Sequence, residues 1–312
     1  MICVTPMRDE PVIAHEARRR GVVGARHQQE HVAWMRAELT AIDAVAEDAP
    51  CLDLLAHASG LAPERYAIDH SLLASHILAA PAEQCHLYGS PAMVARTRQF
   101  GLRLPRKGAF ACHACIDEDL KEKEFSWFRR THQLVGVDRC PEHRLALQKI
   151  MTDQPFQQLP HSWREAGLTS EISLSKSSST AETFIGQHVE ISAALLRRDR
   201  PVPCEPLNQR LYERARALDV GSAKTMGQKL LSDRVLELAG DDWLVRHFPH
   251  FAMKAHGLEY REMENVLKRL GTAAPGESYV LALAALFESA EAALHVIALA
   301  DIDAQTAGRL GE

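Results

Sequence analysis

The stretches FACHAC (residues 110–115) and CPEH (residues 140–143) place three of the seven cysteines and one histidine in two tight pairs. Two residues separate the members of each pair. A Cys-x-x-Cys turn and a Cys-x-x-His turn can each supply one edge of a tetrahedron, which is the ligand arrangement that Zn²⁺ favours. The spacing therefore predicts a small zinc-finger module that holds one structural Zn²⁺ ion. The predicted ligands are Cys112, Cys115, Cys140 and His143.

Two simpler interpretations compete with this one, chance pairing and a redox Cys-x-x-Cys motif. A thioredoxin-type motif opens a helix after a strand of a βαβ unit, and no such pattern surrounds residues 112–115. His113 and His132 are weaker ligand candidates, because His113 adjoins Cys112 and His132 lies outside both pairs. Four protein ligands leave no position for water or substrate, so the sequence favours a structural centre over a metalloenzyme.

The composition indicates a globular protein without a general attraction to nucleic acid or anionic membranes, since the 312 residues carry a formal net charge of −5. The longest apolar run, residues 279–300, contains Glu288 and Glu291, so it predicts core helices and not a membrane span. No signal-peptide pattern is visible. Four of the seven cysteines stand alone, which argues against a disulfide framework and for the reducing cytoplasm.

Helical periodicity dominates the chain, so the sequence predicts a mainly α protein with β candidates only beside the cysteine module. One segment is typical of a helix–turn–helix, because Gly60 ends one helix and Pro63 begins the next. Two late helices are expected over 257–270 and 277–299. The predicted divisions are a poorly ordered N-terminus (1–29), a helical N-terminal module (30–109), the zinc-finger module (110–150), a linker (151–180) and a helical C-terminal domain with a second helix–turn–helix candidate (181–312).

The run CHACIDEDLKEKEFSWFRRTHQLVGVDRCPEHRLAL (residues 112–147) contains Cys-x-x-Cys, an acidic stretch, Trp-x-Arg-x-x-His-Gln, Cys-Pro-x-His and a short apolar tail, in that order. This order resembles the zinc-finger segment of the TniQ family. The resemblance extends with lower specificity over about residues 50–297. It departs near the N-terminus, where the family has a Ser-Trp-x-x-Arg helix and this chain has only Trp34 and Arg36. The residues that match the pattern are Cys112, Cys115, Trp127, Arg129, Arg130, His132, Gln133, Cys140, Pro141 and His143.

The resemblance implies a non-catalytic accessory factor in DNA transposition. TniQ-like proteins link a targeting element, either a DNA site or an RNA-guided targeting complex, to an AAA+ transposition ATPase and a transposase. The implied partners are therefore DNA, these proteins and, as the family suggests, a second copy in a homodimer. No membrane is implied. The alternative is a zinc-containing, DNA-binding transcriptional regulator that uses the same modules without transposase partners.

Local charge supports contact with DNA, because residues 96–149 contain 12 Lys and Arg against 7 Asp and Glu. A solvated helix face is the competing interpretation. Arg129 and Arg130 are favoured as contacts, since guanidinium groups are rarely buried unpaired, whereas Trp127 is expected in the core of the module. Residues 222–231 are the expected recognition helix of the C-terminal helix–turn–helix. The nucleic-acid-binding candidates are Arg129, Arg130, His132, Arg139, Lys224, Thr225, Gln228 and Lys229.

Overall fold

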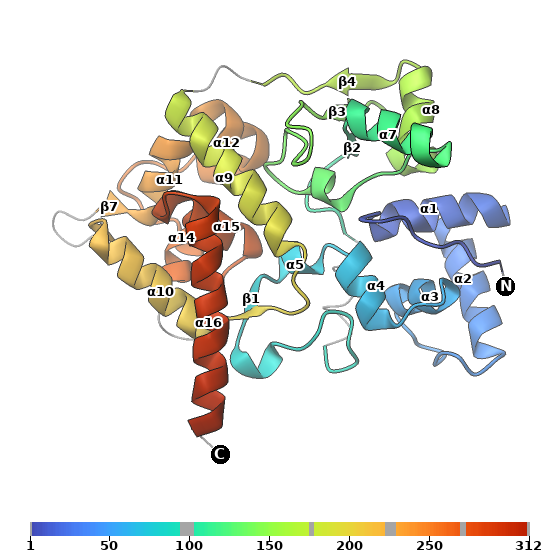
Figure 1. Cartoon of the computed structure of the whole chain (residues 1–312), viewed down its shortest axis with the longest axis horizontal. Helices are drawn as coiled ribbons and strands as arrows, with labels where there is room; N and C mark the ends of the chain where they lie inside the picture. The colour runs from blue at the N-terminus through green and yellow to red at the C-terminus, as the bar shows by residue number, and fades with distance from the viewer. Residues whose placement is uncertain (1, 94–102, 175–177, 222–228, 269–272, 311–312) are drawn as a thin grey trace. The chain divides into compact units, whose positions relative to one another are not determined.

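The structure is a computed structural model in which helices predominate and the strands are two or three residues long (Figure 1). The prediction of a mainly α protein is confirmed. The residues that it describes are 2–93, 103–174, 178–221, 229–268 and 273–310.

Contacts within the chain divide it into two compact units. The N-terminal unit is Met1–Leu73 with Leu87–Leu174, and the C-terminal unit is Ala74–His86 with Ser175–Glu312. This division differs from the linear one that the sequence suggested. Residues 74–86 fold with the C-terminal helices, and the cysteine module shares one unit with the first helices of the chain.

The first 29 residues, predicted to be poorly ordered, contain a helix with buried side chains. Helix α1 (Val12–Val23) buries His15 and Glu16. His15 Nδ1 lies 2.6 Å from the hydroxyl oxygen of Tyr66, and Glu16 Oε1 lies 2.9 Å from Nδ1 of His31. The prediction was wrong because His15, Glu16 and Arg19 lie among the buried residues of α1 and weaken the apolar periodicity that marks a helix.

The predicted helix–turn–helix-like segment is present in the N-terminal unit. It follows helix α2 (Gln28–Thr40) and consists of α3 (Cys51–Ala58) and α4 (Pro63–His70). Gly60, between them, has a φ of 72°, a left-handed conformation that glycine adopts without steric cost. The α4 helix begins at its proline, whose fixed φ suits the first helical position. The side chain of Tyr66 in α4 is fully buried.

The cysteine module lies in a small antiparallel sheet of order β2–β3–β4, as the β candidates beside the module predicted. Phe110 pairs with Lys149, and Lys149 pairs with Ser170. The elements of this part of the chain are β2 (Phe110–Ala111), α7 (His113–Lys123), the 3₁₀ helix η3 (Arg130–Gln133), β3 (Gln148–Ile150), the 3₁₀ helix η4 (Pro155–Gln157), α8 (Pro160–Glu165) and β4 (Thr169–Glu171).

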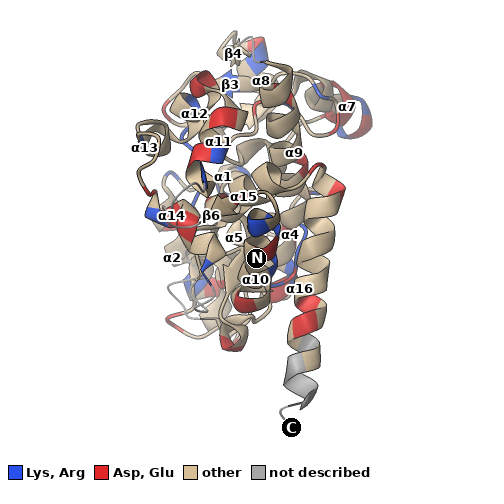
Figure 2. Ribbon diagram, turned by 90° about the vertical axis from the view of Figure 1, so that its left-hand side faces the viewer, with Lys and Arg blue, Asp and Glu red and all other residues tan. Residues whose placement is uncertain are grey.

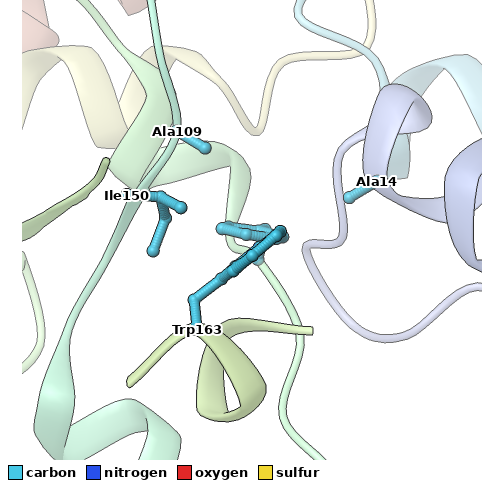
Figure 3. Packing of buried hydrophobic residues seen from close by; sticks show 5 residues of the cluster. Ala14, Ala109, Ile150 and Trp163 are labelled. Atoms are coloured by element: carbon cyan, nitrogen blue, oxygen red, sulfur yellow. The ribbon is translucent and has the colours of Figure 1, made fainter. Parts of the chain in front are cut away.

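Residues 151–174, predicted as part of a linker, belong to the N-terminal unit and contribute Trp163 to its core. Trp163 of α8 is 8% exposed and lies in one apolar cluster with Phe128 and Ile150. Figure 3 shows Trp163 and Ile150 pointing into a common interior. Phe156 adds an edge-on contact with Phe128, with 4.8 Å between ring centres. Two aromatic side chains thus anchor a segment whose polar composition is typical of a linker.

Longer helices form most of the C-terminal unit: α9 (Ser179–Leu195), α10 (Cys204–Ala217), α11 (Leu231–Ala239), α15 (Gly276–Leu286) and α16 (Ala290–Leu310). Helix α15 contacts α9, α10 and α11, and Leu283 at its centre is fully buried. Its one charged residue is Glu277, whereas α16 carries several acidic residues (Figure 2). The helix expected over 277–299 is therefore two helices, and Ser289 Oγ accepts the N–H of Ala292 where the second begins.

Short elements complete the C-terminal unit. Strand β1 pairs in parallel with β5 through Ala79 and Val202, which ties residues 74–86 to this unit. The helix expected over 257–270 is reduced to two short turns within 261–267. These elements are α5 (Leu73–His76), β1 (Ala79–Ala80), η1 (Ala82–Gln84), β5 (Val202–Pro203), β6 (Val220–Gly221), β7 (Lys229–Leu230), α12 (Asp241–His247), α13 (Pro249–Ala252), α14 (Arg261–Glu264) and η5 (Asn265–Leu267).

The C-terminal recognition helix predicted over 222–231 is wrong where the structure describes it. Residues 222–228 lie outside the described residues. Lys229 lies in strand β7, paired with Val220 of β6, and helix α11 begins only at Leu231. Among the described helices, none has both the length and the apolar character that a membrane span requires.

Candidate metal centre

Three cysteine sulfurs and one histidine nitrogen of the N-terminal unit converge within 4.8 Å of one another. The Sγ atoms of Cys115 and Cys140 are 3.7 Å apart. His143 Nδ1 lies 3.8 Å from Cys112 Sγ, 3.3 Å from Cys115 Sγ and 3.6 Å from Cys140 Sγ. A tetrahedron with metal–sulfur bonds of about 2.3 Å and a metal–nitrogen bond of about 2.0 Å has edges of roughly 3.5–3.8 Å. The four predicted ligands therefore have the spacing of one tetrahedral metal site.

The backbone presents each pair in a tight turn. Cys112 is the extended residue directly before α7, and Cys115 lies in the first turn of that helix. The second pair closes a turn in which Cys140 O accepts the N–H of Arg144 at 2.8 Å and Cys140 Sγ accepts the N–H of His143 at 3.4 Å. Arg144 has a φ of 58°, which turns the chain back toward β3. Both turns thus direct their sulfur and nitrogen atoms toward one point.

The three sulfurs are buried, and without a cation they compete for protons. The pKa of Cys112 is lowered because Cys115 and then Cys140 donate hydrogen bonds to its thiolate. The pKa of Cys115 is raised because this thiol donates to Cys112. The pKa of Cys140 rises to about 11, with the hydrogen bond to Cys112 as the largest cause. All three groups could be thiolates together only with a positive charge among them.

His143 is oriented by a carboxylate on the opposite side of its ring. Its Nε2 lies 2.9 Å from Glu118 Oε1, so Nδ1 is the nitrogen that faces the sulfurs. The hydrogen bond with Glu118 raises the pKa of His143, and its side chain is 20% exposed. A carboxylate that accepts the distal N–H of a metal-binding histidine fixes its tautomer and orientation. Glu118 was not predicted from the sequence, where it is one of several acidic residues of α7.

His132, predicted to contact nucleic acid, lies instead against the sulfur cluster. It is 2% exposed, with Nε2 at 3.4 Å from Cys140 Sγ and 3.9 Å from Cys115 Sγ. Burial lowers its pKa to about 4. Because a buried ring has no route to a phosphate or a base, the prediction for this residue is wrong.

Arg129 and Arg130, the favoured DNA contacts, are both engaged inside the N-terminal unit. Arg129 forms a two-bond ion pair with Asp119, at 2.6 and 3.1 Å, and its guanidinium lies 4.2 Å above the Trp127 ring. Trp127 is 7% exposed, as expected of a core residue. The sequence rule that arginines are rarely buried unpaired holds here, because the charge is buried with its partner.

Arg130 joins the cysteine module to the start of the chain. Its Nε donates to Asp9 Oδ1 at 2.9 Å, and its Nη1 donates to the carbonyls of Ile68 and Ser71 at 2.6 and 2.9 Å. The backbone carbonyl of Asp9 accepts the N–H of Arg130 at 2.7 Å. The sequence did not identify Asp9 as the partner of Arg130, because the two residues are 121 positions apart.

Two further buried side chains brace the module. Gln133 Oε1 accepts the N–H of Phe110 at 3.1 Å, and its Nε2 donates to the Phe110 carbonyl at 2.8 Å. The side-chain amide thus satisfies the backbone groups of Phe110 in β2 as a neighbouring strand would. Arg106 lies 3.4 Å from the centre of the Phe110 ring and donates to the backbone carbonyl of His132. Burial lowers the pKa of Arg106 to about 9. Gln133 belongs to the TniQ-like block, but its role required the structure.

The remaining nucleic-acid candidates do not form one site with the metal centre. Arg139 is exposed beside Cys140 in the N-terminal unit. Lys229 belongs to the C-terminal unit and pairs with Glu237. Lys224, Thr225 and Gln228 lie outside the described residues. Of the predicted contacts, Arg139 alone is both described and exposed on the cysteine module.

The donor set fits one metal ion, since buried thiolates and a neutral imidazole suit a soft or borderline divalent cation. Comparison of the chain with models of known protein families and with curated proteins finds no match in either.

Proposed function

We propose that Cys112, Cys115, Cys140 and His143 bind one structural Zn²⁺ ion. Three thiolates and one imidazole, spaced as the edges of a tetrahedron, are a donor set that Zn²⁺ prefers. All four positions belong to the protein, so the ion would carry no water for hydrolysis. Its contribution is to neutralise the thiolates and to hold α7 against the turn before β3. Three reduced thiols also favour a reducing compartment, which we propose is the cytoplasm.

We further propose that the protein is a TniQ-like, non-catalytic accessory factor in DNA transposition, which links target DNA or an RNA-guided complex to a transposition ATPase and transposase. The observation that carries this proposal is the buried cluster together with the block that follows it. Arg129 packs on Trp127 and Gln133 bonds to Phe110 within the module, and Arg130 ties the module to Ile68 of α4. The residues of the resemblance thus act together as one folded module beside a helix–turn–helix-like segment.

Arg139 is the proposed phosphate contact on this module. Its side chain is exposed and it directly precedes a cluster ligand, so the metal would fix its backbone. Replacing Arg139 with alanine should weaken DNA binding by the zinc-loaded full chain and lower the slope of log K against log salt by about one. Lys121→Ala, an exposed cation among the acidic residues of α7, should leave the slope unchanged. Fluorescence anisotropy over a salt series measures both.

The partner test uses purified proteins of the two proposed partner classes, an AAA+ transposition ATPase and a transposase. The zinc-loaded chain should form a complex with the purified ATPase that survives gel filtration, and the Cys115→Ser variant should not. Tight, sequence-specific DNA binding with no affinity for either protein would instead support the transcriptional regulator. Absence of both DNA and ATPase binding by the zinc-loaded chain would contradict the proposed function.

A further inference from the structure

We propose that His132 is a positioning residue of the metal centre, whose Nε2–H donates a hydrogen bond to the Cys140 sulfur. This proposal rests on the proposed metal site. The Nε2 atom lies 3.4 Å from Cys140 Sγ and 3.9 Å from Cys115 Sγ, a range in which N–H groups bond to sulfur. A metal-bound thiolate only accepts, so the imidazole must be the donor.

The other nitrogen of the ring supports this tautomer. His132 Nδ1 is buried and has no hydrogen-bond partner among the described residues. If Nδ1 carried the proton, a buried N–H would be orphaned while the lone pair of Nε2 faced a thiolate. With the proton on Nε2, the N–H is paired and only an acceptor lacks a partner, which is the less costly arrangement.

The distances distinguish His132 from a ligand. His143 Nδ1 lies within 3.8 Å of all three sulfurs, as the fourth vertex of a tetrahedron requires. His132 approaches only the edge between Cys115 and Cys140, and it is not part of the group that fits one ion. It therefore lies outside the ligand tetrahedron.

The surroundings of His132 hold its ring in place. The residue lies in η3, where its backbone carbonyl accepts a hydrogen bond from the buried Arg106. The side chain of its neighbour Gln133 forms hydrogen bonds with both the backbone N–H and the backbone carbonyl of Phe110. An N–H directed at a thiolate withdraws electron density from the sulfur and fixes its orientation. His132 would therefore tighten metal binding without touching the ion.

The first test compares His132→Phe, which removes the donor, with His132→Gln, whose amide Nε2 restores one. His113→Phe is the matched control, since His113 shows no hydrogen bond to a cluster sulfur among the described residues. Metal content of the wild-type chain is measured first, so that failure of the metal site itself is recognised separately. We expect His132→Phe to raise the metal dissociation constant about 10- to 100-fold and His132→Gln to recover most of the loss.

The sulfur itself supplies a second readout. In the Co²⁺-loaded full chain, the sulfur-to-cobalt charge-transfer band should move to lower energy in His132→Phe and return in His132→Gln. A purely structural role would change stability but would not move this band. Wild-type affinity and band energy in His132→Phe would overturn the proposal. So would a tetrahedral Co²⁺ spectrum that persists in His143→Ala and disappears in His132→Phe.

A third measurement needs no variant to fold. In the wild-type chain loaded with ¹¹³Cd and labelled with ¹⁵N-histidine, His132 should show the Nε2–H tautomer and a scalar coupling between that proton and cadmium. An Nδ1–H tautomer without such a coupling would overturn the proposal.

Discussion

The cysteine module and helix α15, which belong to different units, are stabilised by different kinds of contact. The C-terminal unit is built around α15, whose Leu283 and neighbouring apolar residues are buried, with α9, α10, α11, α14 and α16 in contact with this helix. The N-terminal unit buries charged and polar side chains with specific partners, such as Arg130 with Asp9 and His31 with Glu16. Apolar burial tolerates substitution of similar volume, whereas a buried polar group needs one particular partner. We therefore expect the cysteine module to depend on single residues, and on the proposed metal, more than the packing around α15 does.

Removal of the metal should give the largest difference between the units. Structural zinc contributes roughly 10–16 kcal/mol of apparent binding free energy in small modules. We expect Cys115→Ser to lose the metal and to lose amide protection over residues 110–150, while α15 stays protected. Hydrogen exchange with mass spectrometry measures both regions in one sample.

Cys85→Ser is the control for this experiment, because Cys85 is half-buried and lies outside the cluster. It should keep one metal ion per chain. If Cys115→Ser kept full amide protection over residues 110–150, the N-terminal unit would not depend on the metal. The proposed difference between the cysteine module and α15 would then be contradicted.

The next largest effect is expected at Arg130. Replacing it with methionine leaves Asp9 and two backbone carbonyls without their buried donor, which should destabilise the N-terminal unit by about 3–5 kcal/mol. Arg65→Met removes a cation that is 68% exposed and paired with Asp69, so it should change stability by about 0–1 kcal/mol. Urea unfolding of the metal-loaded chain gives both values. Equal losses of unfolding free energy in the two variants would show that burial of the Arg130–Asp9 pair does not contribute to stability.

A cavity in α15 should affect the other unit. Leu283→Ala should destabilise the C-terminal unit by about 2–5 kcal/mol, because the side chain is fully buried, while metal content stays at one per chain. Val245→Ala, at a side chain that is 60% exposed, should have little effect on unfolding. Loss of metal in Leu283→Ala would contradict the assignment of the metal to the other unit.

Acid should weaken the C-terminal unit through His188. Burial lowers the pKa of this histidine from 6.5 to about 3, so the folded chain keeps it neutral. Below pH 6.5 the unfolded chain binds a proton that the folded chain does not, and stability falls until the pH reaches about 3. This group alone should make unfolding about 2 kcal/mol easier at pH 5 than at pH 7.

The variant His188→Phe should remove this slope, since phenylalanine fits the aromatic contacts with Trp243 and Phe248 and does not titrate. His250→Phe, at an exposed position, should keep the slope. An unchanged slope in His188→Phe would mean that other groups cause the acid sensitivity of this unit.

The contrast between the units also explains what the sequence could predict. The turn at Gly60 and Pro63 follows from a local pattern, because glycine conformation acts over a few residues. The four candidate metal ligands follow from one too, because each pair has a short fixed spacing. Helix α1 could not be predicted from a local pattern, since its buried face is partly polar and Tyr66, a partner of His15, lies in a distant segment. The ion pair of Arg130 was missed for the same reason, because its partner Asp9 is far away in sequence.

Two further errors have physical causes of the same kind. Residues 151–180 were predicted as a linker from their polar composition, but two aromatic side chains, Trp163 and Phe156, anchor the part up to residue 174. His132 was predicted as a DNA contact from its place in a basic stretch, and its position against Cys140 follows only from the fold. The composition of a segment is an average over all its residues, whereas a few side chains such as Trp163 decide whether the segment packs into a core.

The most direct test of this account is X-ray absorption spectroscopy at the zinc edge, with elemental analysis, on the full chain purified under reducing conditions. We predict one zinc per chain, with three sulfur ligands at about 2.3 Å and one nitrogen at about 2.0 Å. The absence of bound zinc, or a first shell of different composition, would contradict the central claim.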